Sequence, residues 1–287
     1  MPPKKVKPKG KEKGSVIAIV GTKGGVGKST ISMGTAIWIS NFFQDQWSLL
    51  VDGDIHVRTV ELKMCPGTDV RLAEVLEGTN TLEDAIYLSQ LEADGELLYP
   101  NLAILPAGGR FLPPLRGNPV DFLNRIKGQF GDIVNNIRRR FRYTIIDTPA
   151  SVSFEHLILT STADKVVYVV EPSRDSVSST LQTARGLQEL MNVEPLGVVI
   201  NRLGPRANPE TWIERASKIA PVLGVVPQDE TVNDAFREDL PVVTVDPMCP
   251  ASQAIQEIAQ KIVNTKLKPT DMSKKLDYAI SGILDGK

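Results

Sequence analysis

The feature that most constrains this chain is the stretch Val16–Thr30, which reads VIAIVGTKGGVGKST. Its unbroken apolar run predicts a strand buried on both faces, as strands are in parallel sheets. The run leads into a glycine-rich turn, and Lys-Ser-Thr then opens a segment with helical spacing. A strand, a glycine-rich loop and a helix in this order are the setting of a phosphate-binding loop.

The composition of this loop predicts how it binds phosphate. Glycines let the backbone curl, so that successive N–H groups point into one concavity at the N-terminus of the helix. In such a loop Lys28 reaches the β- and γ-phosphates, and the Ser29 hydroxyl ligates Mg²⁺. We therefore expect nucleotide contacts from the whole run of Gly24, Gly25, Val26, Gly27, Lys28, Ser29 and Thr30.

One position departs from the standard pattern. G-x-x-x-x-G-K-[ST] places its first glycine where this chain has Thr22, and a second lysine, Lys23, precedes the glycines. The motif K-G-G-x-G-K-[ST] resembles the deviant Walker A signature of the MinD/ParA family of P-loop ATPases. In that family the additional lysine reaches across a dimer interface to the ATP of the partner. The resemblance implies this role for Lys23.

Acidic residues end two further predicted strands. Asp147 follows the strand Tyr143–Ile146, and Asp52 and Asp54 follow the strand Ser48–Val51. Ligands of doubly wound sheets bind at the carboxyl ends of the strands, where these side chains would meet. Mg²⁺ prefers hard oxygen ligands and keeps several waters, so few carboxylates suffice, while another acid can orient an attacking water.

The resemblance implies a role for each of these acids. Asp147-Thr-Pro-Ala is similar to the Walker B segment of the MinD/ParA family, and Asp52-Gly-Asp54 is similar to its first switch segment. The resemblance places Asp147 and Asp52 at Mg²⁺ and gives Asp54 the positioning of water. His56 and Thr59 stand where MinD-like sequences commonly carry Gly and Asn, although Ile55, Arg58 and Leu62 still fit. DNA-partition relatives more often read Asp-x-Asp-Pro-Gln, which this chain lacks. This difference favours the MinD-like branch.

Two later segments suggest the site of the base. Asn201 follows the predicted strand Leu196–Ile200, and a side-chain amide that both donates and accepts hydrogen bonds suits the edge of adenine. In the family an Asn-Arg pair contacts adenine here, which implies this role for Asn201 and Arg202. Pro227-Gln-Asp229 resembles the loop on the other side of the nucleotide. Because no strand is followed by Asn-Lys-x-Asp, we expect ATP rather than GTP.

Strands alternate along the chain with helices of ten or more residues, which predicts an α/β fold: a doubly wound, mostly parallel sheet with helices on both faces. The length of 287 residues and the apolar fraction of 41% suit one such domain. We expect a P-loop NTPase domain over residues 15–266, a basic arm over 1–14 and an amphipathic helical extension over 267–287. One short helix is expected at Leu82–Gln90, and Asp69 is expected to cap another.

The composition of the two ends of the chain suggests which partners each end could contact. Residues 1–13 are rich in Pro, Gly and Lys, which predicts a disordered arm that contacts nucleic acid or anionic lipid non-specifically, or is merely solvated. Residues 272–287 carry apolar side chains at helical spacing, like the membrane-targeting helix of MinD proteins. This segment lacks Phe and Trp and has a mixed polar face, so packing on protein is the alternative to contact with a membrane.

No apolar run reaches the roughly 18 residues of a membrane span, and the two cysteines, Cys65 and Cys249, have no Cys-x-x-Cys spacing. We expect inert thiols in a cytoplasmic protein, peripheral at a membrane or nucleoid.

The resemblance implies a homodimer in the ATP state, slow hydrolysis to ADP and phosphate, and an activating protein partner. Three outputs remain: a MinD-like positioning ATPase, a ParA-like ATPase that partitions DNA, and a metal-insertion or Fe–S scaffold ATPase. The absence of a Cys-x-x-Cys weakens the third.

Overall fold

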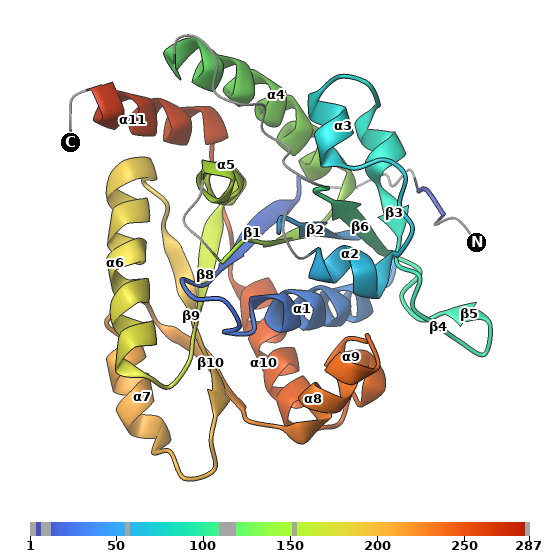
Figure 1. Cartoon of the computed structure of the whole chain (residues 1–287), viewed down its shortest axis with the longest axis vertical. Coiled ribbons are helices and arrows are strands. Elements are labelled where there is room, and N and C mark those ends of the chain that lie inside the picture. The colour runs from blue at the N-terminus through green and yellow to red at the C-terminus, as the bar shows by residue number, and fades with distance from the viewer. Residues whose placement is uncertain (1–3, 7–12, 55–57, 109–118, 151–153, 285–287) are drawn as a thin grey trace.

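The computed structural model describes residues 4–6, 13–54, 58–108, 119–150 and 154–284. An eight-stranded sheet runs through the molecule in the order β10-β9-β8-β1-β7-β2-β6-β3 (Figure 1). Neighbouring strands are parallel except for β3, which is antiparallel to β6. The predicted doubly wound α/β fold is therefore confirmed. The strands of this sheet are β1 (Ser15–Val20), β2 (Ser48–Asp52), β3 (Tyr87–Leu88), β6 (Leu102–Pro106), β7 (Tyr143–Asp147), β8 (Lys165–Val170), β9 (Pro195–Leu203) and β10 (Val222–Pro227).

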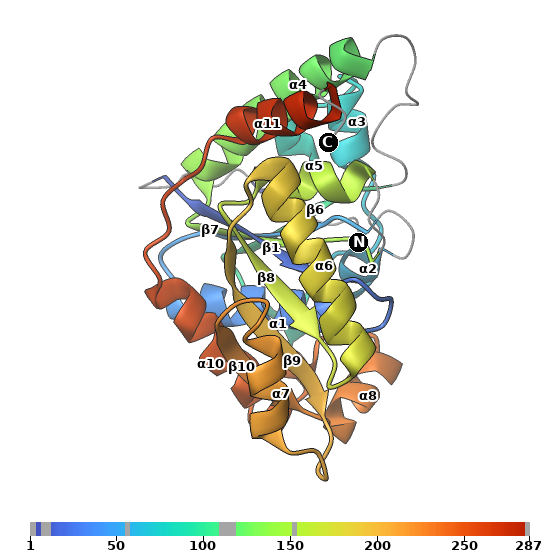
Figure 2. The ribbon, with the colours of Figure 1, turned by 90° about the vertical axis from the view of Figure 1, so that its left-hand side faces the viewer.

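Helices cover both faces of the sheet (Figures 1 and 2). One face carries α1 (Lys28–Phe42), α2 (Thr59–Met64), α8 (Glu230–Arg237), α9 (Val242–Val245) and α10 (Pro250–Asn264). The other face carries α3 (Leu72–Leu76), α4 (Pro119–Arg140), α5 (Phe154–Thr162), α6 (Arg174–Met191), α7 (Pro209–Ala216) and α11 (Met272–Leu284). A small hairpin, β4 (Glu92–Ala93) with β5 (Glu96–Leu97), projects from the β3 edge.

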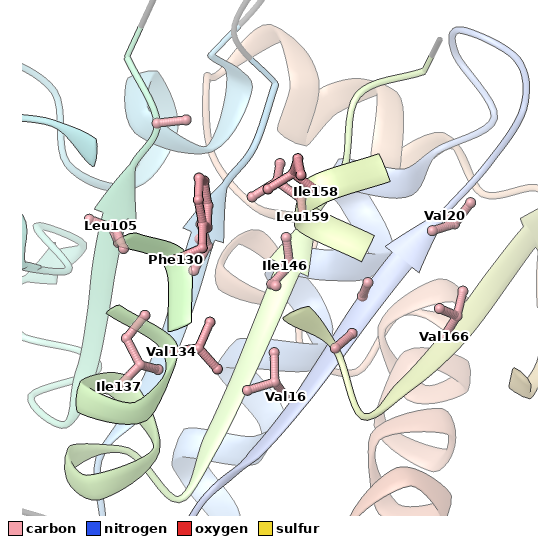
Figure 3. Packing of buried hydrophobic residues seen from close by; sticks show 14 of the residues in the cluster. Val16, Val20, Leu105, Phe130, Val134, Ile137, Ile146, Ile158, Leu159 and Val166 are labelled. Carbon is pink, nitrogen blue, oxygen red and sulfur yellow. The ribbon is translucent and has the colours of Figure 1, made fainter. Parts of the chain in front are cut away.

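The core on the α4 face illustrates how the strands are buried. Phe130, Val134 and Ile137 of α4 lie over Val16 of β1 and Ile146 of β7 (Figure 3). All are at most 7% exposed. On the opposite face α1 packs so closely on α10 that a Cβ at Gly34 would lie 2.9 Å from Cγ2 of Ile255. The P-loop helix is thus clamped between the sheet and α10.

Two local predictions are wrong. The helix expected at Leu82–Gln90 is a 3₁₀ turn over Leu82–Ala85, with a capping box formed by Thr81 and Asp84, followed by strand β3. The buried Tyr87 pairs with β6 instead, because its ring enters the core and its hydroxyl donates to Asp69 at 2.6 Å. Asp69 is therefore occupied, and Arg71 is the N-cap of α3. The helix α5 was not expected.

Part of the predicted disordered arm is ordered. Lys5 forms an antiparallel bridge with Tyr87, and the Val6 amide donates to the Ile86 carbonyl at 3.2 Å. The physical reason is the free edge of β3, whose backbone groups need hydrogen-bond partners. The lysines at 7, 9 and 11 lie outside the described residues.

The C-terminal extension forms the expected helix, α11, which lies beside α4 and α5 (Figure 2). Met272 and Leu276 are about as buried as the core itself, at 5% and 4% exposed. Lys127 of α4 forms an ion pair with Asp277 at 2.5 Å. Met272 and Leu276 of α11 thus pack on the domain, whereas Tyr278 is exposed. The side chains of residues 279–284, and residues 285–287, lie outside the description.

Candidate functional site

The glycine-rich loop joins β1 to α1 in the predicted way. Gly25 and Gly27 have φ angles of 80° and 91°, in the left-handed region that favours glycine. A side chain at position 27 would also collide with the Asn201 amide, since a Cβ there would lie 2.1 Å from Nδ2. Gly27 precedes the first helical residue, Lys28, so the loop presents its N–H groups at the N-terminus of α1.

Lys28 lies in the interior of the site. The residue is 6% exposed, and burial lowers the pKa of its ammonium group. The negative charges of Asp147 and Asp54 oppose this shift of the pKa of Lys28. A buried lysine between carboxylates suits the binding of phosphate, which would supply further negative charge.

Asp147 is held beside the loop by two hydroxyl groups. Ser29 donates to one carboxylate oxygen at 2.6 Å and Ser32 donates to the other at 2.9 Å. Asp147 is fully buried, and this burial raises its pKa to about 6. Sequence reasoning missed Ser32, although its place one helical turn after Ser29 was a usable signal.

Asp52 lies next to Asp147 because β2 and β7 pair in register at these two residues. Asp52 is 1% exposed, and burial, together with repulsion from Asp147, raises its pKa to about 8. Its carboxylate accepts N–H groups of Glu61 at 2.8 Å and of Asp54 at 3.2 Å. Asp54 is half-buried and its charge acts on both Lys28 and Asp147. His56 lies outside the described residues.

These oxygens fit a hydrated Mg²⁺. Two adjacent buried carboxylates with raised pKa values form a strongly unfavourable pair when both ionise, and a cation would relieve their repulsion. Within the described ranges, no three His, Cys, Asp or Glu side chains gather into a site that would hold a metal unaided. Mg²⁺ seldom requires one, because it takes one or two carboxylates together with phosphates and waters. Ser29, Asp147 and, through water, Asp52 are the residues that would hold it.

A cavity of about 280 Å³ opens beside α1 at the carboxyl ends of β9 and β10. Its volume is just below the range of pockets for drug-sized ligands, which suits a single base. The structure brings together here five of the predicted residues, Thr30, Asn201, Arg202, Pro227 and Asp229. The walls that sequence reasoning missed come from β10, the following loop, α8 and α10: Val226, Gln228, Val232, Asn233, Ala251 and Ile255.

The predicted base-contacting residues also brace the phosphate loop. Asn201 Nδ2 donates to the Val26 carbonyl at 2.8 Å, which leaves its amide oxygen as the acceptor. Arg202 donates to the Gly25 carbonyl at 2.6 Å and to Glu171 at 3.0 Å. Asp229 caps α8 by accepting from Thr231 N at 3.0 Å, and it accepts from Ala251 N at 3.0 Å.

Residues 17–242 match the model of the CobQ/CobB/MinD/ParA nucleotide binding domain. The chain belongs to this family. An ATP-binding protein of Methanocaldococcus jannaschii is 32% identical over 273 residues, covering 94% of this chain and 95% of that protein. The septum site-determining protein MinD of Helicobacter pylori is 29% identical over 284 residues, covering 93% and 98%.

Solved MinD structures share the fold of this MinD/ParA-family chain. MinD of Pyrococcus horikoshii in complex with Mg-ADP superimposes with a TM-score of 0.71 at 23% identity, covering 87% of this chain and 96% of that one. The family match and the MinD relative confirm the resemblance to the MinD/ParA family. Among the described residues of this family member, none of the helices has the length and apolarity of a membrane span.

The signature lysine of this MinD/ParA-family chain lies on the surface. Lys23, Gly24 and Gly25 are all exposed. A Cβ placed on either glycine would meet nothing within 4 Å. The phosphate loop therefore has an open tip that carries Lys23 and a packed base that carries Lys28.

Proposed function

We propose that this chain is a Mg-ATP-dependent ATPase switch of the MinD/ParA type, which dimerises with ATP bound and positions a cellular cargo. The observation that carries the proposal is that the two lysines of the loop lie in different surroundings. Lys28 is buried among the carboxylates, whereas Lys23 is exposed on the open tip. An exposed lysine beside the phosphate site is available to the nucleotide of a second copy.

In the proposed reaction the loop N–H groups and Lys28 bind the β- and γ-phosphates. Asp54 orients a water for in-line attack on the γ-phosphorus, and the bond to the β-γ bridging oxygen breaks, giving ADP and phosphate. Lys23 of the second copy stabilises the charge that develops on the phosphates. Bound Mg²⁺ supplies further neutralisation of this charge. Loss of the γ-phosphate then releases the segments after Asp52 and Asp147, and the dimer separates.

Two observations favour a MinD-like output over the alternatives. The curated relatives include MinD of Helicobacter pylori at 29% identity over 93% of this chain. Both cysteines, Cys65 and Cys249, are buried at 0% and 4% exposed, which disfavours an Fe–S scaffold. We propose a cytoplasmic protein that an activating partner stimulates and that acts at a membrane or nucleoid surface. Residues 272–287 remain a candidate for the membrane contact and residues 1–13 for nucleic acid.

The test is size-exclusion chromatography with light scattering in ADP and in ATP. The wild type should be monomeric with ADP and dimeric with ATP. Asp54→Ala should accumulate the ATP dimer, since binding persists while attack by water fails, and Lys23→Ala should stay monomeric. Lys218→Ala, which alters an exposed lysine after α7, is the matched control and should behave as the wild type. A wild-type monomer in every nucleotide would refute the switch.

A separate experiment measures whether the ATP-bound protein binds a membrane or DNA. ATP-dependent sedimentation with anionic liposomes, without a salt-sensitive shift of DNA on gels, supports the MinD-like output. A salt-sensitive shift of DNA on gels, without sedimentation with anionic liposomes, supports the DNA-partition alternative.

A further inference from the structure

Thr22, which stands where the standard phosphate loop has glycine, is tied to another element of the fold. Its hydroxyl lies 2.9 Å from Ser179 Oγ and 3.2 Å from Thr180 Oγ1, both on α6. The three hydroxyl groups form a small cluster, in which each can donate and accept. Glycine at this position would have no side chain with which to form the tie.

The support that α6 offers is rigid. This helix spans 18 residues and begins with Ser173 as its N-cap, which accepts from the Ser176 amide. Thr180 is fully buried, and Val177 and Leu187 belong to the core on this face of the sheet. Thr22 is therefore attached to a packed element and not to a loop that could follow its movement.

The loop changes from packed to open on either side of Thr22. Just before it, a Cβ at Gly21 would lie 2.7 Å from Val26 Cγ2 and 3.0 Å from Lys28 Cγ, so the base of the loop is tight. Just after it, Lys23 is exposed and Gly24 and Gly25 have open surroundings. Thr22 is thus the last tethered residue before the signature lysine.

We propose that Thr22 is a positioning residue for Lys23. Its hydrogen bonds to α6 set the direction in which the chain leaves the packed base, so that the Lys23 ammonium is presented to the second copy of the molecule. The inference rests on the proposed function, because Lys23 matters in this way only if ATP brings two copies together. Binding of nucleotide within one copy depends on Lys28 and the loop amides instead, and does not require Thr22.

The test compares Thr22→Val with Thr22→Ser. Valine keeps the shape of threonine but removes the hydroxyl group, whereas serine keeps the hydroxyl and loses only the methyl. Thr22→Val should lower kcat and raise the ATP concentration needed for dimerisation by about fivefold to tenfold, as expected for the loss of one or two hydrogen bonds. Its affinity for a fluorescent ADP analogue should change less than twofold, and Thr22→Ser should restore dimerisation. Ser179→Ala removes the shorter bond from the α6 side and should act like Thr22→Val, with a melting temperature as a check on folding.

A double-mutant cycle separates this inference from the proposed function. If Thr22 acts through Lys23, Thr22→Val should change dimerisation less when added to Lys23→Arg, a variant that keeps the positive charge and should weaken dimerisation without preventing it, than when added to the wild type. Additive effects, wild-type dimerisation of both Thr22→Val and Ser179→Ala, or an equal loss of ADP affinity would overturn the role of Thr22 while Lys23→Ala still prevents dimerisation. If Lys23→Ala itself dimerises normally, the proposed function fails at Lys23 and the inference about Thr22 fails with it.

Discussion

At the scale of single residues, the site contains two buried carboxylates whose negative charges repel each other. Asp52 and Asp147 are paired in register on adjacent strands, and both are buried, so their ionised forms are costly in the absence of ligand. The pKa of Asp52 is raised to about 8 and that of Asp147 to about 6. Binding of a cation and of a nucleotide held by Lys28 would replace this repulsion with attraction.

The first prediction concerns the stability of the ligand-free protein against pH. A carboxyl whose pKa is raised on folding stabilises the fold fully below its unfolded pKa of about 3.9, and this contribution is lost as pH rises towards its folded pKa. For Asp52, with a folded pKa of about 8, the loss extends over pH 4 to 8 with a slope of up to about 1.4 kcal/mol per pH unit. Asp52→Asn should therefore be more stable than the wild type at pH 8, with a smaller difference at pH 5.

Urea unfolding with EDTA and without nucleotide measures this difference. Asp132→Asn, at an exposed position on α4, is the matched control and should change the free energy of unfolding by less than about 0.5 kcal/mol. An Asp52→Asn variant that is less stable than the wild type at pH 8 would contradict the assignment of buried, costly charge to Asp52.

At the scale of elements, the C-terminal extension is joined to the domain by a buried polar network. Asp164, fully buried, accepts from Arg138 of α4 at 2.6 Å and from the Thr270 amide at 2.6 Å. The same carboxylate accepts the Val16 amide of β1 at 2.8 Å. Lys275 of α11 donates to the Ala163 carbonyl just after α5, and burial lowers the pKa of this lysine to about 8. The network thus connects α11 with α4, α5 and β1.

The second prediction follows from the packed face of α11. Leu276→Ala should lower the free energy of unfolding by about 2–5 kcal/mol, because a buried leucine is replaced without refilling the space. Lys274→Ala, at an exposed position on the same helix, should change it by less than about 0.5 kcal/mol. Chemical denaturation of both variants measures the contrast. Equal, negligible effects would show that α11 is not packed on the domain in solution, and would favour a helix available for lipid.

At the scale of the whole molecule, one sheet joins two hydrophobic clusters. Strand residues alternate between the two faces, so that Val16 and Ala18 belong to one cluster while Ile17 and Ile19 belong to the other. Neither layer of helices can be lost without exposing half of each central strand. The molecule should therefore unfold as one unit.

The third prediction uses the tryptophans as local reporters. Trp38 packs against the cluster on the α1 face, whereas Trp47 and Trp212 pack against the cluster on the α4 face. Fluorescence of a variant that keeps only Trp38, fluorescence of one that keeps only Trp212, and circular dichroism should give coincident unfolding curves. Curves separated along the denaturant axis would indicate that the two layers unfold independently.

Local spacing accounts for the part of the site that could be predicted. Gly27, Lys28 and Ser29 are consecutive, and Asp52 and Asp147 each end an apolar run, so motif and strand together place them at the same edge of the sheet. The prediction at Leu82–Gln90 was wrong because contacts with distant residues outweighed the local spacing. Helical spacing was real there, but Tyr87 gains more from burial and from pairing with β6.

The sequence by itself determined the fold class, the phosphate loop and the acids beside it, because each depends on neighbours within a few positions of the chain. Only the tertiary structure decided the contacts between distant segments. It brought α8 and α10 to the cavity beside Asn201, tied Thr22 to α6, and packed Leu276 of α11 on the domain. Contacts of this kind depend on which surfaces meet when helices cover both sides of the sheet. The spacing of residues along the chain does not predict them.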